Sequence, residues 1–173
     1  MNPTYHPFLQ PKYVNEFSCD GTRCDDNCCK SNWEIYVDKE HYDMMHRICT
    51  GEMREKIIHN VLRNPNASSE SDYAIITFND CSHQCTFLSS DNKCSMQVMH
   101  GNTILGNTCN NYPRTINMVD GVLEKSLTMS CPLAASIALC NSSPMCFEVC
   151  NDLSRVIMAK EPLNTQTEVY NDS

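Results

Sequence analysis

Cysteine is the most unusual feature of this 173-residue chain, which contains thirteen cysteines. A chain of this length can build one domain with a modest core, so the cysteines need an explanation of their own. Disulfide frameworks form in oxidising compartments, which a protein reaches with an export signal. The first 18 residues have no basic start followed by an apolar run. We therefore expect free thiols in a cytoplasmic protein, and a secreted disulfide protein is the weakest alternative.

Charge and hydropathy restrict the partners of the chain. Its formal net charge is −8, and its thirteen Lys and Arg residues do not cluster. Nucleic-acid backbones are bound by basic surfaces, so a nucleic-acid partner is not expected. The longest nearly apolar stretch runs from Cys131 to Cys140, which is far shorter than the roughly 20 residues of a membrane-spanning helix. A membrane partner is therefore not expected either.

The distribution of prolines and polar residues predicts three segments. Residues 1–18 contain three prolines, which favours an extended N-terminal segment rather than a helix or a strand. Residues 19–160 contain all the cysteines, and we expect them to form a cysteine-cluster metal-binding domain. The polar residues 161–173 are typical of a flexible tail.

Apolar residues at three- and four-residue intervals predict the helices. Residues 38–62 show this period, with Asp38 as N-cap and Thr50-Gly51 as a point where two helices could meet. Pro132 is suited to the first position of a further helix. A last helix is expected over residues 145–159.

Two segments predict strands. Residues 73–78 form a β-branched and aromatic run, and Asp120-Gly121 is typical of the turn of a β-hairpin. The expected fold is therefore mainly α with a small β-hairpin, in an irregular, cysteine-rich, metal-centred single domain.

The spacing of the cysteines indicates a thiolate metal site. Zinc and iron–sulfur centres take soft sulfur ligands, and ligands that are close in sequence lose less chain entropy when the site assembles. Cys24, Cys28 and Cys29 lie within six residues, and further cysteines follow at wider intervals. The predicted ligands are Cys19, Cys24, Cys28, Cys29, Cys85, Cys94, Cys109 and Cys131.

Several details of this site stay open. Adjacent cysteines such as Cys28 and Cys29 rarely form a disulfide, so they could serve two centres, or one could be a packed thiol. No standard ferredoxin or zinc-finger spacing matches, so the residues do not choose between zinc and an iron–sulfur cluster. Cys81 and His83 could be ligands or loop residues. Cys49, Cys140, Cys146 and Cys150 are interpreted as structural free thiols on or near helices.

Four segments together resemble the flagellin lysine-N-methylase family, which overlaps with a broader group of zinc- or iron-chelating cysteine-cluster domains. They are the run from Cys19 to Val37, Cys85-Thr86-Phe87-Leu88 with Cys94, the run from Cys109 to Arg114, and Ser130-Cys131-Pro132 with Ala134-Ala135. Members of this family are longer, so the chain is expected to be a short or truncated member.

The resemblance implies a bacterial cytoplasmic protein that transfers methyl groups from S-adenosylmethionine to lysines of flagellin or another protein. It also implies a metal centre, either a 4Fe–4S cluster or zinc. Methyl transfer requires a deprotonated amine; Tyr112, Asp25, Asp26 and Glu34 are candidate proton acceptors, and no catalytic residue is assigned. Tyr112 and Arg114 are candidate cofactor-binding residues, with Arg114 donating hydrogen bonds to cluster sulfur or to a cofactor carboxylate, or instead pairing with a loop acid.

The chain also departs from common methyltransferase patterns. It has no glycine-rich loop after a first strand, and the motif Cys-x3-Cys-x2-Cys is broken because Cys29 follows Cys28 directly. The alternative function is therefore a non-enzymatic zinc- or iron-binding module. The oligomeric state is not predicted.

Overall fold

The computed structural model describes residues 7–19, 24, 27–30, 33–79, 81–151, 157–158 and 163–165. The chain divides into two compact units. Unit 1 combines residues 1–18 with residues 111–173, and unit 2 contains residues 19–110. Compact units need not fold independently, so the domain of residues 19–160 stays a prediction.

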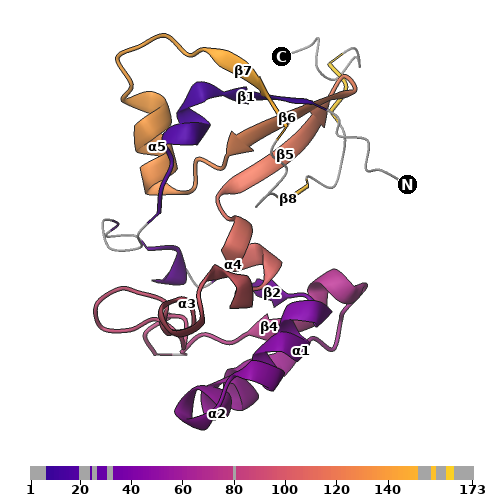
Figure 1. Ribbon diagram of the computed structural model, residues 1–173, viewed down its shortest axis with the longest axis vertical. Coiled ribbons are helices and arrows are strands. Elements are labelled where there is room, and N and C mark those ends of the chain that lie inside the picture. Colours follow the sequence, from indigo (N-terminus) through magenta and orange to yellow (C-terminus); the bar gives the residue numbers. More distant parts are fainter. Residues whose placement is uncertain are drawn as a thin grey trace. The chain divides into compact units, whose positions relative to one another are not determined.

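Unit 1 contains a sheet whose described strands follow the order β7-β1-β6-β5-β8 (Figure 1). At its centre, β5 (Arg114–Val119) and β6 (Val122–Leu127) form an antiparallel hairpin. Asp120 and Gly121 in its turn have φ values of 49° and 80°, which a two-residue hairpin turn of the primed type requires. The hairpin that the sequence predicted is therefore confirmed.

The remaining strands of this sheet come from both ends of the chain. β1 (Phe8–Pro11) pairs in parallel with β6 and antiparallel with β7 (Phe147–Cys150). β8 (Ile157–Met158) pairs in parallel with β5. Segments far apart in sequence therefore meet in one sheet.

The core of unit 1 lies between a short 3-10 helix, η1 (Lys12–Glu16), and α5 (Pro132–Leu139). Pro132 begins α5, as predicted, because the missing N–H of proline costs nothing in the first turn. The buried side chains belong to Tyr13, Val14, Phe17, Leu127, Cys131 and Ala134.

Unit 2 contains a second sheet, with the described strands in the order β2-β4-β3. Both pairings are antiparallel, and the strands are β2 (Ile35–Val37), β3 (Val61–Arg63) and β4 (Ala74–Ile76). Two helices, α1 (Lys39–Ile48) and α2 (Gly51–Asn60), connect β2 to β3. The predicted division at Thr50-Gly51 and the predicted strand within residues 73–78 are both confirmed.

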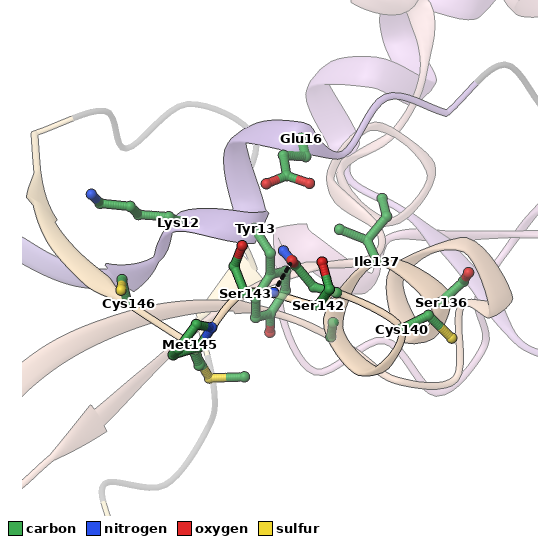
Figure 2. Close-up of a pocket in the computed structure, with 13 residues that line it drawn as sticks. Lys12, Tyr13, Glu16, Ser136, Ile137, Cys140, Ser142, Ser143, Met145 and Cys146 are labelled. Atoms are coloured by element: carbon green, nitrogen blue, oxygen red, sulfur yellow. Dashed lines mark hydrogen bonds between the residues drawn. The ribbon is translucent and has the colours of Figure 1, made fainter.

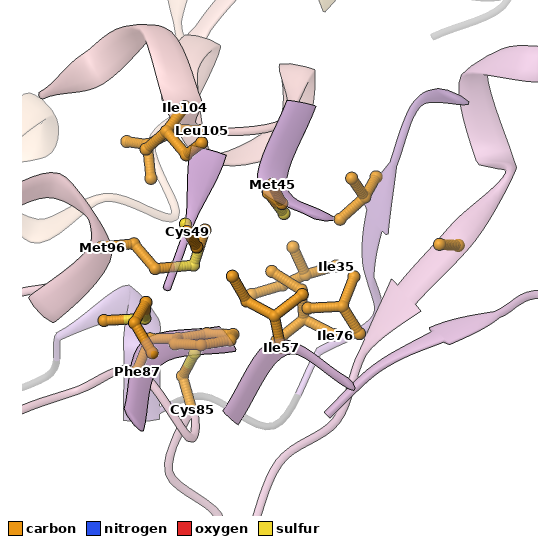
Figure 3. Packing of buried hydrophobic residues seen from close by; sticks show 14 residues of the cluster. Ile35, Met45, Cys49, Ile57, Ile76, Cys85, Phe87, Met96, Ile104 and Leu105 are labelled. Atoms are coloured by element: carbon orange, nitrogen blue, oxygen red, sulfur yellow. The ribbon is translucent and has the colours of Figure 1, made fainter. Parts of the chain in front are cut away.

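Short elements complete unit 2. They are η2 (Cys28–Lys30), η3 (Glu70–Asp72), α3 (Ser95–His100), η4 (Asn102–Ile104) and α4 (Asn107–Asn111). Figure 3 shows how side chains from β2, β4, α1, α2, α3 and η4 meet in one apolar core. Cys85 and Phe87 lie in this core beside Met96, so the core includes a cysteine of the predicted metal site.

The predicted fold class is wrong, because the described chain is a mixed α/β structure with two sheets. Residues 145–159 were expected to be helical, yet β7 and β8 lie there. Phe147 and Val149 are exposed, whereas Glu148 and Cys150 are half-buried, and this alternation has the period of a strand. The metal-centred part of the description stays a proposal.

The N-terminal prediction is also wrong. Within residues 7–18 the chain forms β1 and η1 instead of a continuous extended lead-in. Phe8 is only 1% exposed, and β1 is paired on both sides. The helical segment predicted to reach residue 62 ends at Asn60, and β3 begins at the next residue, Val61. Strand pairing with distant residues overrides the local pattern in both places.

The predicted tail of residues 161–173 lies largely outside the described residues. The described part, residues 163–165, contacts the hairpin: Leu163 N–H donates to the carbonyl of Met118 at 2.7 Å, and Thr165 N–H donates to Asp120 at 2.8 Å. Among the described residues, no helix is long and apolar enough to cross a membrane.

Asp38 begins α1 and also holds the start of α4. Its carboxylate accepts the N–H of His41 at 3.1 Å and the N–H of Asn107 at 3.1 Å, and it contacts the His41 ring at 2.7 Å. Burial alone would raise the pKa of Asp38, but these hydrogen bonds outweigh burial and lower it. Asp38 thus confirms the predicted N-cap and adds a contact that the sequence did not predict.

Substituting Asp38→Ala should lower the free energy of unfolding by about 2–3 kcal/mol, because one cap and one charged hydrogen bond are lost. Since the folded-state pKa of Asp38 is depressed, its contribution is present above the ordinary carboxyl pKa of about 3.9 and is lost as pH falls below it. Urea unfolding at several pH values measures both effects. Asp43→Ala on the same helix is the control, because its pairing with Lys39 is exposed. Equal losses in the two variants would contradict this role.

Candidate metal centre

Within the described residues, unit 2 brings together five of the predicted ligands, here called the thiol cluster. Each of these thiols affects the pKa of at least one other, so each has another thiol of the group in its neighbourhood. Most of the cluster also packs against the apolar core of the unit. The thiol cluster consists of Cys28, Cys29, Cys85, Cys94 and Cys109.

Backbone contacts connect the segments that carry the first four of these residues. The N–H of Cys85 donates to the carbonyl of Cys29 at 2.7 Å, which joins η2 to the 85–88 segment. Cys85 pairs with Phe78, and Cys94 pairs with Leu88, as isolated antiparallel bridges. These two bridges fix the backbone at Cys85 and at Cys94, which are nine positions apart in sequence.

Cys109 is placed by α4, which is fastened to β2. The Thr108 hydroxyl donates to the carbonyl of Tyr36 at 2.9 Å, and Asp38 accepts the N–H of Asn107. A Cβ at Gly106 would lie 3.3 Å from the Cα of Val37, so the lack of a side chain permits this close approach. These contacts join residues about 70 positions apart, and no local sequence pattern could have indicated them.

Cys28 and Cys29 interact directly. The Cys29 thiol donates a hydrogen bond to the sulfur of Cys28, which lowers the pKa of Cys28 to about 7 and raises that of Cys29. Asn27 accepts the N–H of Cys29 at 2.9 Å, and Trp33 donates to the carbonyl of Cys28 at 2.8 Å. Sequence reasoning missed Asn27 and Trp33, although both lie beside the cysteine run.

The pKa values of the other three thiols are raised. Burial raises the pKa of Cys85 to about 11 and also raises the pKa values of Cys94 and Cys109. The negative charge of neighbouring thiolates adds to each of these increases. A cation placed among the sulfurs would oppose both effects, because it stabilises the deprotonated thiolate that metals bind.

The arrangement does not amount to a preformed metal site. Among the described residues, no group of three or more His, Cys, Asp or Glu side chains is placed so that it could hold a metal ion. The Cys29 thiol is instead hydrogen-bonded to the sulfur of Cys28. Binding a metal would require this contact to be replaced.

Three further predicted ligands are not among the five residues that define the thiol cluster. Cys19 is exposed and Cys24 is half-buried, and several residues between them and Cys28, including Asp25 and Asp26, lie outside the described residues. Cys131 is buried in the core of unit 1. Their role as ligands stays a prediction.

The remaining cysteines divide into two groups. Cys49 is buried in the core of unit 2, as expected of a structural thiol. Cys140 and Cys146 are exposed, and Cys150 is half-buried in β7, so the apolar helix face expected for them is not found. Cys81 and His83 are exposed in a turn.

Comparisons with known proteins test the predicted resemblance. The chain is 28% identical over 127 residues to the flagellar biosynthetic protein FliU of Salmonella muenchen, and the match covers 73% of each protein. It is also 28% identical over 130 residues to the lysine-N-methylases of Salmonella typhimurium and Salmonella choleraesuis. The chain is therefore similar in sequence to FliU and to two lysine-N-methylases. The predicted resemblance to the flagellin lysine-N-methylase family is therefore confirmed.

Coverage differs among these relatives. The match spans 73% of this chain but only 31% of the length of each lysine-N-methylase. No model of a protein family matches the chain, and no solved structure matches it. The activity of the longer relatives is therefore a proposal for this chain.

The residues that the resemblance suggested for cofactor binding lie in unit 1. The Tyr112 hydroxyl is 3.2 Å from the Ser130 hydroxyl, and the peptide bond between Tyr112 and Pro113 is cis. The Arg114 guanidinium lies 5.0 Å from the centre of the Phe17 ring. Glu34, a candidate proton acceptor, accepts a hydrogen bond from the Tyr36 hydroxyl. Their roles toward a cofactor or an amine stay predictions.

Proposed function

We propose that this chain takes part in lysine methylation of flagellin or another protein, with S-adenosylmethionine as methyl donor and a metal centre at the thiol cluster. The observation that carries the proposal is the convergence of Cys28, Cys29, Cys85, Cys94 and Cys109 in a relative of the lysine-N-methylases. The similarity to lysine-N-methylases supports methyl transfer to lysine as the reaction. The five thiols support the binding of a metal.

The donor set suits a soft metal ion or an iron–sulfur cluster. The thiol cluster supplies five sulfur donors. Thiolates select zinc and iron–sulfur clusters over hard cations such as Mg²⁺. A 4Fe–4S cluster or a structural zinc ion takes four cysteines, so the thiol cluster has one sulfur more than either needs. Cys28 and Cys29 would then be alternatives at one position.

In methyl transfer, the lysine nitrogen forms a bond to the methyl carbon while the bond from that carbon to the sulfonium sulfur breaks. The amine must first lose a proton, because an ammonium has no lone pair for attack. Tyr112 and Glu34 are our candidates for accepting that proton, together with Asp25 and Asp26. When bound, an iron–sulfur or zinc centre would supply positive charge and hold together the segments that carry its ligands.

Incubating the anaerobically purified protein with flagellin and S-adenosylmethionine labelled in its methyl group tests the enzyme. We expect label in the lysines of flagellin, detected by mass spectrometry of its peptides. Omitting flagellin is the control for self-methylation. A chain that is metal-loaded and folded but transfers no label would contradict the enzymatic proposal.

A non-enzymatic zinc- or iron-binding module is the second candidate. It is favoured by the location of the whole thiol cluster within unit 2, so that metal binding needs no residue of unit 1. Elemental analysis with an electronic spectrum identifies the metal: absorbance near 400 nm indicates an iron–sulfur cluster, and a colourless protein with stoichiometric zinc indicates zinc. Metal binding without methyl transfer would favour this second candidate.

A further inference from the structure

Unit 1 contains a pocket of about 630 Å³ that the thiol cluster does not use (Figure 2). Its walls are η1, the last turn of α5 and the loop of residues 140–146 that follows α5. Small-molecule sites commonly have volumes of 300–1,000 Å³, so this space can receive a side chain or a small ligand. The charge and polarity of the lining residues determine which ligand the pocket can bind.

The acidic group of the pocket is Glu16. Figure 2 shows its carboxylate directed toward Tyr13 and the loop serines, whereas the amino group of Lys12 points away from them. Hydrogen bonds lower the pKa of Glu148, and the charge of Lys12 lowers it further. No described residue forms an ion pair or hydrogen bond with Glu16, so its negative charge is available to a ligand.

The end of α5 adds partial negative charge. The last carbonyls of a helix have no intrahelical partner, and they favour cations. The last turn of α5 contains no basic residue. The hydroxyls of Ser142 and Ser143 line the same pocket and can accept hydrogen bonds. A ligand with several N–H donors and a positive charge would satisfy these groups.

Apolar side chains complete the lining. Tyr13 is buried in the core of unit 1, and Ile137 packs against that core. Together they offer a surface for an alkyl chain, next to the carboxylate of Glu16. An alkyl chain that ends in an ammonium group, as in the side chain of lysine, matches both parts of the pocket.

We propose that this pocket binds a lysine side chain of a protein substrate, with Glu16 facing the ammonium group and Tyr13 and Ile137 contacting the alkyl stem. The inference rests on the proposed function for the identity of the substrate. The pocket itself is defined within unit 1 alone, so binding can be measured separately from methyl transfer.

Two matched probes test the proposal on the full, metal-loaded chain by NMR titration. Nα-acetyl-lysine amide carries the ammonium, and Nα-acetyl-norleucine amide has a similar stem without it. We expect the lysine probe to bind at least about tenfold more tightly and to shift amide signals of residues 136–146. Glu16→Gln should weaken binding of the lysine probe at least about fivefold. Glu52→Gln, an exposed glutamate on α2, should leave it unchanged.

Equal binding of the two probes, unchanged binding in Glu16→Gln, or shifts confined to other residues would each overturn the inference. The methyl-transfer assay separates the two proposals. Selective lysine binding without methyl transfer would support the pocket and count against the enzyme. Methyl transfer with the same KM in Glu16→Gln as in the parent chain would support the enzyme and count against the pocket.

Discussion

Replacing Cys85 and Cys109 together by serine should reduce the metal content of the purified protein at least about tenfold. Serine hydroxyls remain protonated at neutral pH and are hard donors, so they do not replace thiolates in a zinc or iron–sulfur site. Removing two of the five thiols leaves three, which is fewer than a structural site needs. Elemental analysis after anaerobic purification measures the loss.

The control is the double variant Cys140→Ser and Cys146→Ser, which removes two exposed thiols of unit 1. It should keep the metal content of the parent chain. Circular dichroism of both variants distinguishes loss of ligands from loss of folding. A folded Cys85→Ser, Cys109→Ser variant with full metal content would contradict the assignment of the thiol cluster as the metal centre.

Removal of the metal by a chelator should also lower the melting temperature by several degrees, because binding free energy at a structural site is folding free energy. The segments that carry Cys28 and Cys94 are short and would gain most from a shared ion. Calorimetry with and without chelator measures the effect. Unchanged melting would show that the metal does not contribute to folding.

Replacing Phe87 by alanine should destabilise the protein by about 3–5 kcal/mol, since it removes a large side chain from a packed core. Phe87 is 1% exposed and lies in the core beside Cys85 and Met96 (Figure 3). Its carbonyl also accepts the N–H of Ser95 at 2.8 Å, which connects it to the start of α3. Loss of this packing should therefore also loosen the segment between Cys85 and Cys94.

Urea unfolding measures the loss in stability, and metal content measures the effect on the thiol cluster. Val98→Ala is the matched control, because Val98 is an apolar residue of α3 that is 67% exposed. It should change the free energy of unfolding by no more than about 0.5 kcal/mol. Similar losses for the two variants would contradict the packing described for unit 2.

Local signals in the sequence predicted several elements correctly. Asp38 caps α1 because its carboxylate accepts an N–H three residues later, and Pro132 begins α5 because its ring suits the first turn. Asp120 and Gly121 form the hairpin turn because both adopt positive φ. Each of these signals acts within about four residues.

The strands at the two ends of the chain show why the fold class was not predictable. Leu9 pairs with Val149 on one side and with Glu124 on the other. The stability of β1 and β7 therefore comes from partners more than a hundred residues away, whereas the apolar pattern of residues 145–159 is also compatible with a helix. Propensity alone could not decide between them.

The sequence by itself determined the supply of thiols, the local caps and turns, and the similarity to FliU and the lysine-N-methylases, because all of these depend on residue type and spacing. Only the tertiary structure decided which thiols meet. Cys109 joins Cys28 and Cys85 because Asp38 and Tyr36 hold α4 against β2, while Cys131 packs in the core of unit 1. Such contacts connect distant segments through packing and hydrogen bonds, and spacing along the chain does not encode them.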